Sequence, residues 1–255
     1  MQWQAMKFIM LALPVALSFN SSAHAQWRYS AYVQANAGNY IYTTTARNYY
    51  LTQGLQYRRE RWSLEANVSL VARIGDSLRV QGGGIMSSNE GMTMSSGIGD
   101  VFVRANYALA EQRNQWPSIT VGALGKIPTA SAIDGFGTGE WDAGVFLSLA
   151  RFKNNFYVSA SLGYLWFGDP PGVTYADPLS YSVGVGRSFA GNRLGVLLLY
   201  SGTGRILDEY EAPRQIGMGF NWLASKRFGV FTTFYSGLSE TVPDLSFSFG
   251  MNTVL

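Results

Sequence analysis

The chain has no cysteine, and its single histidine, His24, lies within the first 25 residues. The lack of cysteine excludes disulfides and thiolate metal sites. A mature protein that starts after residue 25 would also have no imidazole, which excludes Ser-His and Asp-His catalysis and histidine-ligated metals. We therefore expect no enzyme activity, no metal site and no cofactor.

Long apolar runs and a large net charge are also missing. The longest apolar run, FIMLALPVALSF at residues 8–19, is shorter than the about 20 residues that a membrane-spanning helix needs. The formal net charge is only +3 over 255 residues, so nothing points to a nucleic-acid partner. Helical membrane proteins and nucleic-acid-binding proteins are therefore not expected.

The N-terminus has the order of features that is typical of a secretory signal peptide. Lys7 precedes the apolar run, and the small-residue step Ala23-x-Ala25 follows it. The alternative is an uncleaved membrane anchor, but Pro14 interrupts the run and the Ala-x-Ala step is close. We expect residues 1–25 to be a signal peptide that is cleaved after Ala25, and residues 26–255 to form one exported domain.

The chain does contain regular alternation of apolar and polar residues. From Trp62 to Leu70 every second residue is apolar, and the residues between are Ser, Glu and Asn. Alternation predicts strands with one apolar face. The pattern recurs at residues 101–109, 141–150, 156–164, 215–222 and 245–252.

A soluble β-sandwich would alternate too, but its polar face meets water and is typically rich in Lys and Glu. Here 47% of the residues are hydrophobic and only 14% are charged, and the polar face is mostly Gly, Ser, Asn and Thr. Small polar residues suit a crowded lumen, and large apolar residues suit lipid. We therefore predict an all-β fold, a transmembrane antiparallel up-and-down β-barrel.

Short and long connections alternate along the chain, as in outer-membrane barrels with short periplasmic turns and long outer loops. We expect about twelve strands, two aromatic girdles and both termini in the periplasm. The segment 75–96 is predicted to hold either an extra strand pair or a loop folded into the pore. The predicted strands are 27–36, 48–58, 61–73, 97–109, 117–127, 140–152, 155–167, 177–189, 193–202, 212–223, 226–237 and 243–255.

Charged residues are predicted on the lumen face of strands three to six. A hairpin centred near Arg113 would place Asp100 opposite Lys126 near the outer mouth. Such a set is either an ion-pair network that supports the wall or a selectivity ring, and in the second case Lys126→Ala would keep the fold and shift conductance toward cations. The predicted lumen residues are Glu65, Arg73, Asp100, Arg104, Lys126, Glu140 and Asp142.

Two other candidate sites do not fit their chemistry. Gly97-x-Gly99 lacks the third glycine and the helix of a nucleotide-binding loop. Asp134, Glu140 and Asp142 offer too few oxygens for calcium, which takes six to eight. We interpret these residues as strand-entry glycines and surface acids.

Five short motifs over about two-thirds of the chain carry a resemblance to a known family. They are Gly97–Asp100 (GIGD), Lys126–Thr129 (KIPT), Gly137–Glu140 (GTGE) with Asp142, Gly163–Tyr164 (GY) and Gly237–Ser239 (GLS). In this order they resemble the MetA-pathway phenol-degradation family. The resemblance implies an outer-membrane barrel with a role in the passage of small compounds, aromatic ones among the candidates.

The C-terminal residues, Ser248-x-Gly250-x-x-Thr253-x-Leu255, are similar to the signal that the outer-membrane assembly machinery reads. Thr253 and Leu255 stand where strong hydrophobic residues are usual. The expected partners are outer-membrane lipid, this machinery and a small solute, in a Gram-negative bacterium.

Our hypothesis is a passive channel or carrier for small molecules, with hydrophobic or aromatic compounds as candidates. The alternative is a structural or adhesive barrel whose lumen is filled by side chains. An open path through the lumen would favour the channel, and a packed lumen would favour the structural barrel.

Overall fold

The computed structural model describes residues 26–39, 46–74, 77–81, 84–88 and 94–255, so the predicted signal peptide lies outside the described residues. All named elements are strands. The part of the chain that the structure describes contains no helix long and apolar enough to cross a bilayer.

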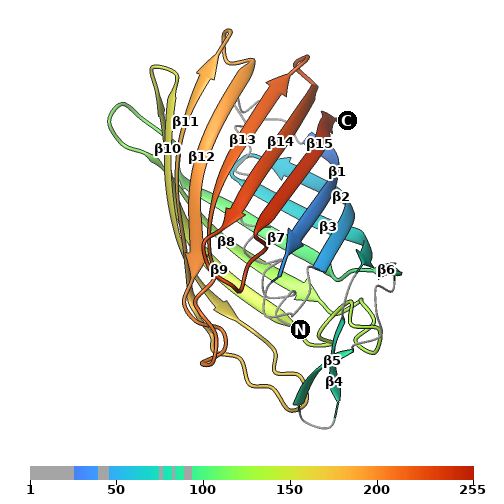
Figure 1. Cartoon of the computed structure of the whole chain (residues 1–255). Coiled ribbons are helices and arrows are strands. Elements are labelled where there is room, and N and C mark those ends of the chain that lie inside the picture. Colours follow the sequence, from blue (N-terminus) through green and yellow to red (C-terminus); the bar gives the residue numbers. More distant parts are fainter. Residues whose placement is uncertain (1–25, 40–45, 75–76, 82–83, 89–93) are drawn as a thin grey trace.

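Twelve strands form a closed antiparallel barrel, in which each strand pairs with the next and β1 pairs with β15 (Figure 1). Closure leaves no free sheet edge, which is the condition for strands that cross a membrane. The barrel strands are β1 (Gln26–Gly38), β2 (Ala46–Arg59), β3 (Trp62–Ile74), β7 (Val101–Ala110), β8 (Ser118–Ile127), β9 (Asp142–Lys153), β10 (Phe156–Trp166), β11 (Leu179–Phe189), β12 (Leu194–Thr203), β13 (Arg214–Leu223), β14 (Phe228–Gly237) and β15 (Leu245–Val254).

The twelve predicted strands are confirmed, with ends that differ by a few residues. The predicted strand 97–109 is divided into β6 (Met94–Ile98) and β7, which pair with successive parts of β3. Leu70 lies opposite Ile98, but Asn67 lies opposite Phe102. The chain from β6 to β7 therefore has one more residue than the part of β3 that it pairs with. An extra residue in one strand is a β-bulge, and it switches which residues of that strand face the lumen.

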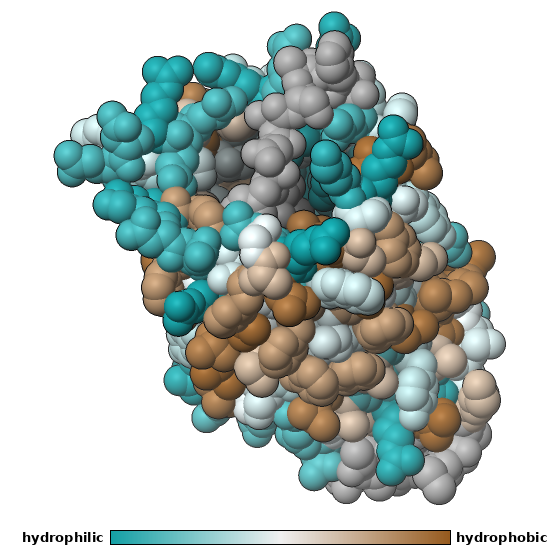
Figure 2. All heavy atoms as spheres, turned by 90° about the horizontal axis from the view of Figure 1, so that it is seen from above, coloured by the Kyte–Doolittle hydropathy of each residue, from teal (hydrophilic) through white to brown (hydrophobic). Residues whose placement is uncertain are grey.

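The outer face of the barrel is apolar and exposed (Figure 2). The side chains predicted to face lipid are between 38% and 57% exposed, which confirms that orientation. A wall of large exposed apolar side chains is stable only against lipid. These side chains are Trp62, Leu64, Val145, Leu147, Leu162, Phe220 and Phe247.

The two ends of the barrel differ in their connections. At one end the turns are short, and Asn154 and Asn155 take φ angles of 51° and 66°, the left-handed values that suit a two-residue hairpin turn. Aromatic pairs flank this end, with 4.8 Å between the ring centroids of Trp27 and Tyr57. Trp and Tyr are enriched where a barrel meets the membrane surface. The other end carries the long loops and the Tyr164–Trp166 ring pair.

The segment 75–96 holds an extra strand pair, the first of the two predicted possibilities. β4 (Ser77–Gln81) and β5 (Gly84–Ser88) pair only with each other among the described strands. In Figure 1 this hairpin projects from the long-loop end of the barrel.

Candidate functional site: the barrel lumen

Long loops fold inward at the outer mouth and pack on the lumen face of the wall. Phe102 of β7 and Leu165 of β10 are buried against Phe167, Tyr175 and Ile206 of the loops. The Phe167 and Tyr175 rings meet at an angle, with 6.1 Å between their centroids. We call these five residues the mouth core. It places apolar side chains inside the long-loop end of the lumen.

Burial changes the chemistry of Tyr175 in this core. The apolar surroundings, followed by the carboxylates of Asp142 and Asp169, raise the pKa of its phenol. The phenol is therefore neutral at ordinary pH and packs as an aromatic side chain.

The 128–141 loop packs on the opposite side of the mouth. Phe136, which is 4% exposed, lies against Tyr50, Val71 and Ala130. The guanidinium of Arg73 lies over the Phe136 ring, 5.3 Å from its centroid, and donates a hydrogen bond of 2.5 Å to the Gly135 carbonyl. The predicted lumen residue Arg73 therefore holds this loop.

Lys126 and Asp142 form a buried ion pair between β8 and β9. The two residues are direct cross-strand partners, and Lys126 Nζ lies 2.5 Å from Asp142 Oδ2, with Lys126 completely buried. Nζ also donates to Thr138 Oγ1 at 2.7 Å, and Asp142 Oδ1 accepts from the Gly168 amide at 3.0 Å. This one pair thus ties two long loops to the wall.

Asp100 lies within the bulged stretch between Ile98 and Phe102 and contacts the 128–141 loop. Its Oδ1 accepts a hydrogen bond of 3.0 Å from the Ala130 amide, and the residue is completely buried. Thr129 Oγ1 accepts from the Val101 amide at 3.0 Å and lies 3.2 Å from the Gly99 carbonyl.

The predicted pairing of Asp100 with Lys126 is wrong. Phe102 lies opposite Lys126, because the turn falls at Asn114 and Gln115, between the bridged residues Arg113 and Trp116, and the register then shifts between Ala108 and Ala110. Together these two features move each partner by two residues from the prediction, which keeps all side chains on their predicted face. Glu140 lies in the loop before β9, half-buried, and its amide donates to Thr138 Oγ1.

Glu65 and Arg104 lie deeper in the lumen as direct cross-strand partners. Arg104 lies over the Phe146 ring, with 5.1 Å to its centroid, and Glu65 Oε1 accepts from Asn67 Nδ2 at 2.9 Å. The predicted charges therefore divide into two groups. Arg73, Asp100, Lys126 and Asp142 hold loops at the mouth, with Glu140 beside them, whereas Glu65 and Arg104 lie below.

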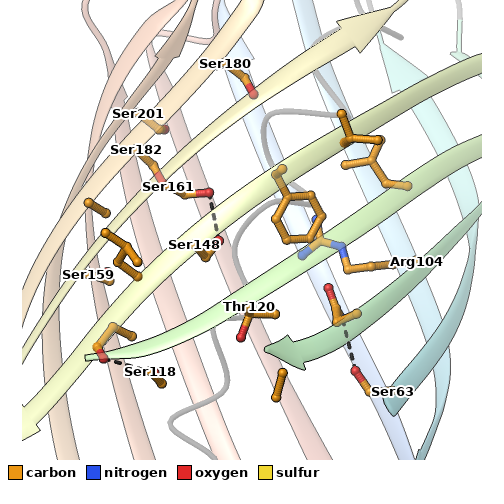
Figure 3. A pocket seen from close by; sticks show the side chains of 18 of the residues that line it. Ser63, Arg104, Ser118, Thr120, Ser148, Ser159, Ser161, Ser180, Ser182 and Ser201 are labelled. Atoms are coloured by element: carbon orange, nitrogen blue, oxygen red, sulfur yellow. Dashed lines mark hydrogen bonds between the residues drawn. The ribbon is translucent and has the colours of Figure 1, made fainter. Parts of the chain in front are cut away.

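Between the mouth core and the short-turn end, side chains leave a cavity of about 270 Å³ in the lumen. It extends from Arg58 and Arg61 at the short-turn end to Leu165 and Gly202 near the long loops. Figure 3 shows Arg104 on one side of it and many serine hydroxyls on the other. The labelled polar residues are Ser63, Arg104, Ser118, Thr120, Ser148, Ser159, Ser161, Ser180, Ser182 and Ser201.

Six of the inward polar residues form a continuous cross-strand row, which we call the hydroxyl row. Ser148 and Ser161 share a hydrogen bond of 2.9 Å, and Gln215 Nε2 donates to Ser201 Oγ at 3.2 Å. Barrel strands are tilted, so a row perpendicular to them climbs along the axis. The row rises from the short-turn end of β8 to the long-loop end of β13. Its members in order are Thr120, Ser148, Ser161, Ser182, Ser201 and Gln215.

Reasoning from sequence alone missed the hydroxyl row and the inward position of Arg58. Alternation placed several of the serines inward, but only the register of five strand pairs aligns them. Among the residues that the structure describes, no group of three or more acidic, histidine or cysteine side chains could hold a metal ion.

Solved structures of outer-membrane barrels share this fold. An outer membrane channel from Pseudomonas putida F1 is 12% identical with a TM-score of 0.69, covering 94% of this chain and 98% of its own. The monoaromatic hydrocarbon channel CymD is 13% identical with a TM-score of 0.52, covering 96% and 92%. The translocator domain of the autotransporter NalP from Neisseria meningitidis is 12% identical with a TM-score of 0.56, covering 98% and 94%. At these identities the similarity shows a shared transmembrane β-barrel fold.

Comparison with curated protein sequences finds no significant match. The family described as "Putative MetA-pathway of phenol degradation" matches residues 16–254, which extends the resemblance seen from Gly97 onward to nearly the whole chain. The chain belongs to this family.

Proposed function

We propose that the protein is a passive outer-membrane channel for small molecules, aromatic compounds among them. The observation that carries this proposal is the cavity of about 270 Å³ below the mouth core, with a hydroxyl row on one wall and Phe146 and Tyr157 among its aromatic lining residues. Ligand pockets combine apolar surface with a few placed polar groups in this way. The family and the channel folds cited above support the same assignment.

Opening of the mouth is part of the proposal. Loops hold the upper end of the lumen closed through a few anchors, chiefly the Lys126–Asp142 pair and Phe136. Loops that rest on few contacts open at lower free energy than the wall. Solute would pass when the loops move away from the wall.

The second candidate is a structural barrel whose loops do not open. The mouth core favours it, because five buried apolar side chains fill the upper lumen. Permeation distinguishes the two. Proteoliposomes should admit solutes with a single ring and exclude solutes several times larger, whereas a structural barrel would admit neither.

Three further parts of the proposal concern export and chemistry. Residues 1–25 would be cleaved as a signal peptide, and N-terminal sequencing of envelope-purified protein should begin at Gln26. The last strand, β15, would be read by the assembly machinery, and its pairing with β1 is compatible with that role. The protein would have no catalytic activity, in keeping with a lumen that has neither histidine nor cysteine.

A further inference from the structure

Positive charge is concentrated on the β2, β3 and β7 side of the cavity. Arg58, Arg61 and Arg104 line it, and no Asp or Glu is found among the described residues that do so. The guanidinium of Arg104 lies over the Phe146 ring, 5.1 Å from its centroid. The lining alone therefore carries three positive charges.

The nearest carboxylate on the wall does not neutralise this set. Glu65 is the direct partner of Arg104 on one side and of Gln56 on the other. Gln56 in turn lies opposite Arg28, and Arg58 follows two residues later on the same face of β2. Cross-strand neighbours lie about 5 Å apart and diagonal ones about 7–8 Å apart, so one carboxylate serves three guanidinium groups. The net charge of this part of the lumen is positive.

The remaining lining suits an aromatic ring with a polar substituent. Phe146 and Tyr157 offer ring faces and edges, Leu165 and Leu124, the partner of Arg104, add apolar surface, and the hydroxyl row offers donors. A cavity of about 150 Å³ holds benzene, so about 270 Å³ holds one ring with a small substituent. Guanidinium groups pair with carboxylates through two parallel hydrogen bonds.

The two ends of the barrel indicate the side from which an anion would arrive. Four long loops, 128–141, 167–178, 204–213 and 238–244, carry nine carboxylates and one arginine. In contrast, ten lysines and arginines and only two glutamates lie within three residues of the five short turns. Fields of this kind steer charged solutes, so an anion is attracted at the short-turn end and repelled at the outer mouth.

We propose that the lumen cavity binds small aromatic carboxylates that enter from the short-turn side. This inference rests on the proposed channel function, because it names the class of solute that the channel takes.

The test is calorimetric titration of the refolded, detergent-solubilised protein with benzoate and with benzylammonium, a cation of similar size. Benzoate should bind about tenfold more tightly than benzylammonium. Arg58→Gln and Arg104→Gln should each weaken benzoate binding about fivefold, because each removes one charge near the carboxylate. Arg59→Gln is the matched control, since Arg59 is the exposed, outward neighbour of Arg58 and should leave binding unchanged.

Equal affinity for benzoate and benzylammonium, or unchanged benzoate binding in Arg58→Gln, would overturn the proposal. Arg58 is half-exposed, so its variant keeps the test valid when Arg104→Gln does not fold. If proteoliposomes admit no solute while benzoate still binds, the channel function fails and the anion site stands. If solutes pass but the protein binds benzoate and benzylammonium with equal affinity, the anion site alone fails.

Discussion

The outer mouth and the lower lumen of this barrel differ in both charge and packing. At the mouth, Asp100, Lys126 and Asp142 are buried and contact loop residues, and two apolar clusters lie at the same end. In the lower lumen, arginines and hydroxyls face a cavity. The same lumen face therefore serves two purposes. Charges at the mouth hold loops in place, whereas Arg58, Arg61 and Arg104 line the cavity.

The largest effect is expected from Lys126→Met, which leaves the Asp142 carboxylate buried without its partner. Breaking a buried ion pair costs about 3–5 kcal/mol. This replaces the expectation that Lys126→Ala would only shift ion selectivity, because Lys126 is completely buried. Urea unfolding in micelles measures the loss. Lys153→Met, at the exposed short-turn end, is the control, and the double variant with Asp142→Leu should recover most of the loss. A loss below about 1 kcal/mol would contradict the buried pair.

Phe136→Ala should open the mouth at a cost of about 3 kcal/mol in the stability of the loop packing. The ring is buried against Tyr50 and Val71, so its removal frees the 128–141 loop. In limited proteolysis, the protease should cleave this loop faster in Phe136→Ala than in the unaltered protein. Ile133→Ala is the control, because Ile133 lies in the same loop and is 88% exposed. The protease should cleave this variant at the same rate as the unaltered protein. Equal rates for the two variants would show that Phe136 does not hold the loop.

High pH should loosen the mouth core through Tyr175. Its pKa is raised in the folded protein, so above about pH 10 the unfolded chain releases a proton that the folded chain retains. Stability is therefore lost as pH rises above that value, by about 1 kcal/mol at pH 11 from this group. Tyr175→Phe should show a smaller loss between pH 10 and pH 11 than the unaltered protein. Identical losses would mean that the phenol is not in the buried environment described.

The smallest effect is expected in the hydroxyl row. Ser161→Ala removes the hydrogen bond with Ser148 and the longer one to the Leu147 carbonyl, and a hydrogen bond of this kind is worth about 1 kcal/mol. The lower lumen should thus tolerate this change with little loss in unfolding free energy, unlike the mouth. A loss as large as that of Lys126→Met would erase the distinction between the two regions.

Strands, faces and strand number were predictable from sequence, because alternation has a period of two and each apolar face must meet lipid. Seven outward side chains, from Trp62 to Phe247, confirm this. The contacts at the mouth were not predictable, since they depend on where a hairpin is centred. The turn at Asn114 and Gln115, the register shift between Ala108 and Ala110, and the bulge between Ile98 and Phe102 decide which charges meet. The inward folding of the 128–141 and 167–178 loops carries no periodic signal at all.

Planar-bilayer conductance tests the central claim most directly. The account predicts discrete conductance steps for the refolded protein, open for a larger fraction of time in Phe136→Ala and unchanged in Ile133→Ala. A bilayer that stays silent with both the unaltered protein and Phe136→Ala, when both are shown to be folded and inserted, would contradict a channel.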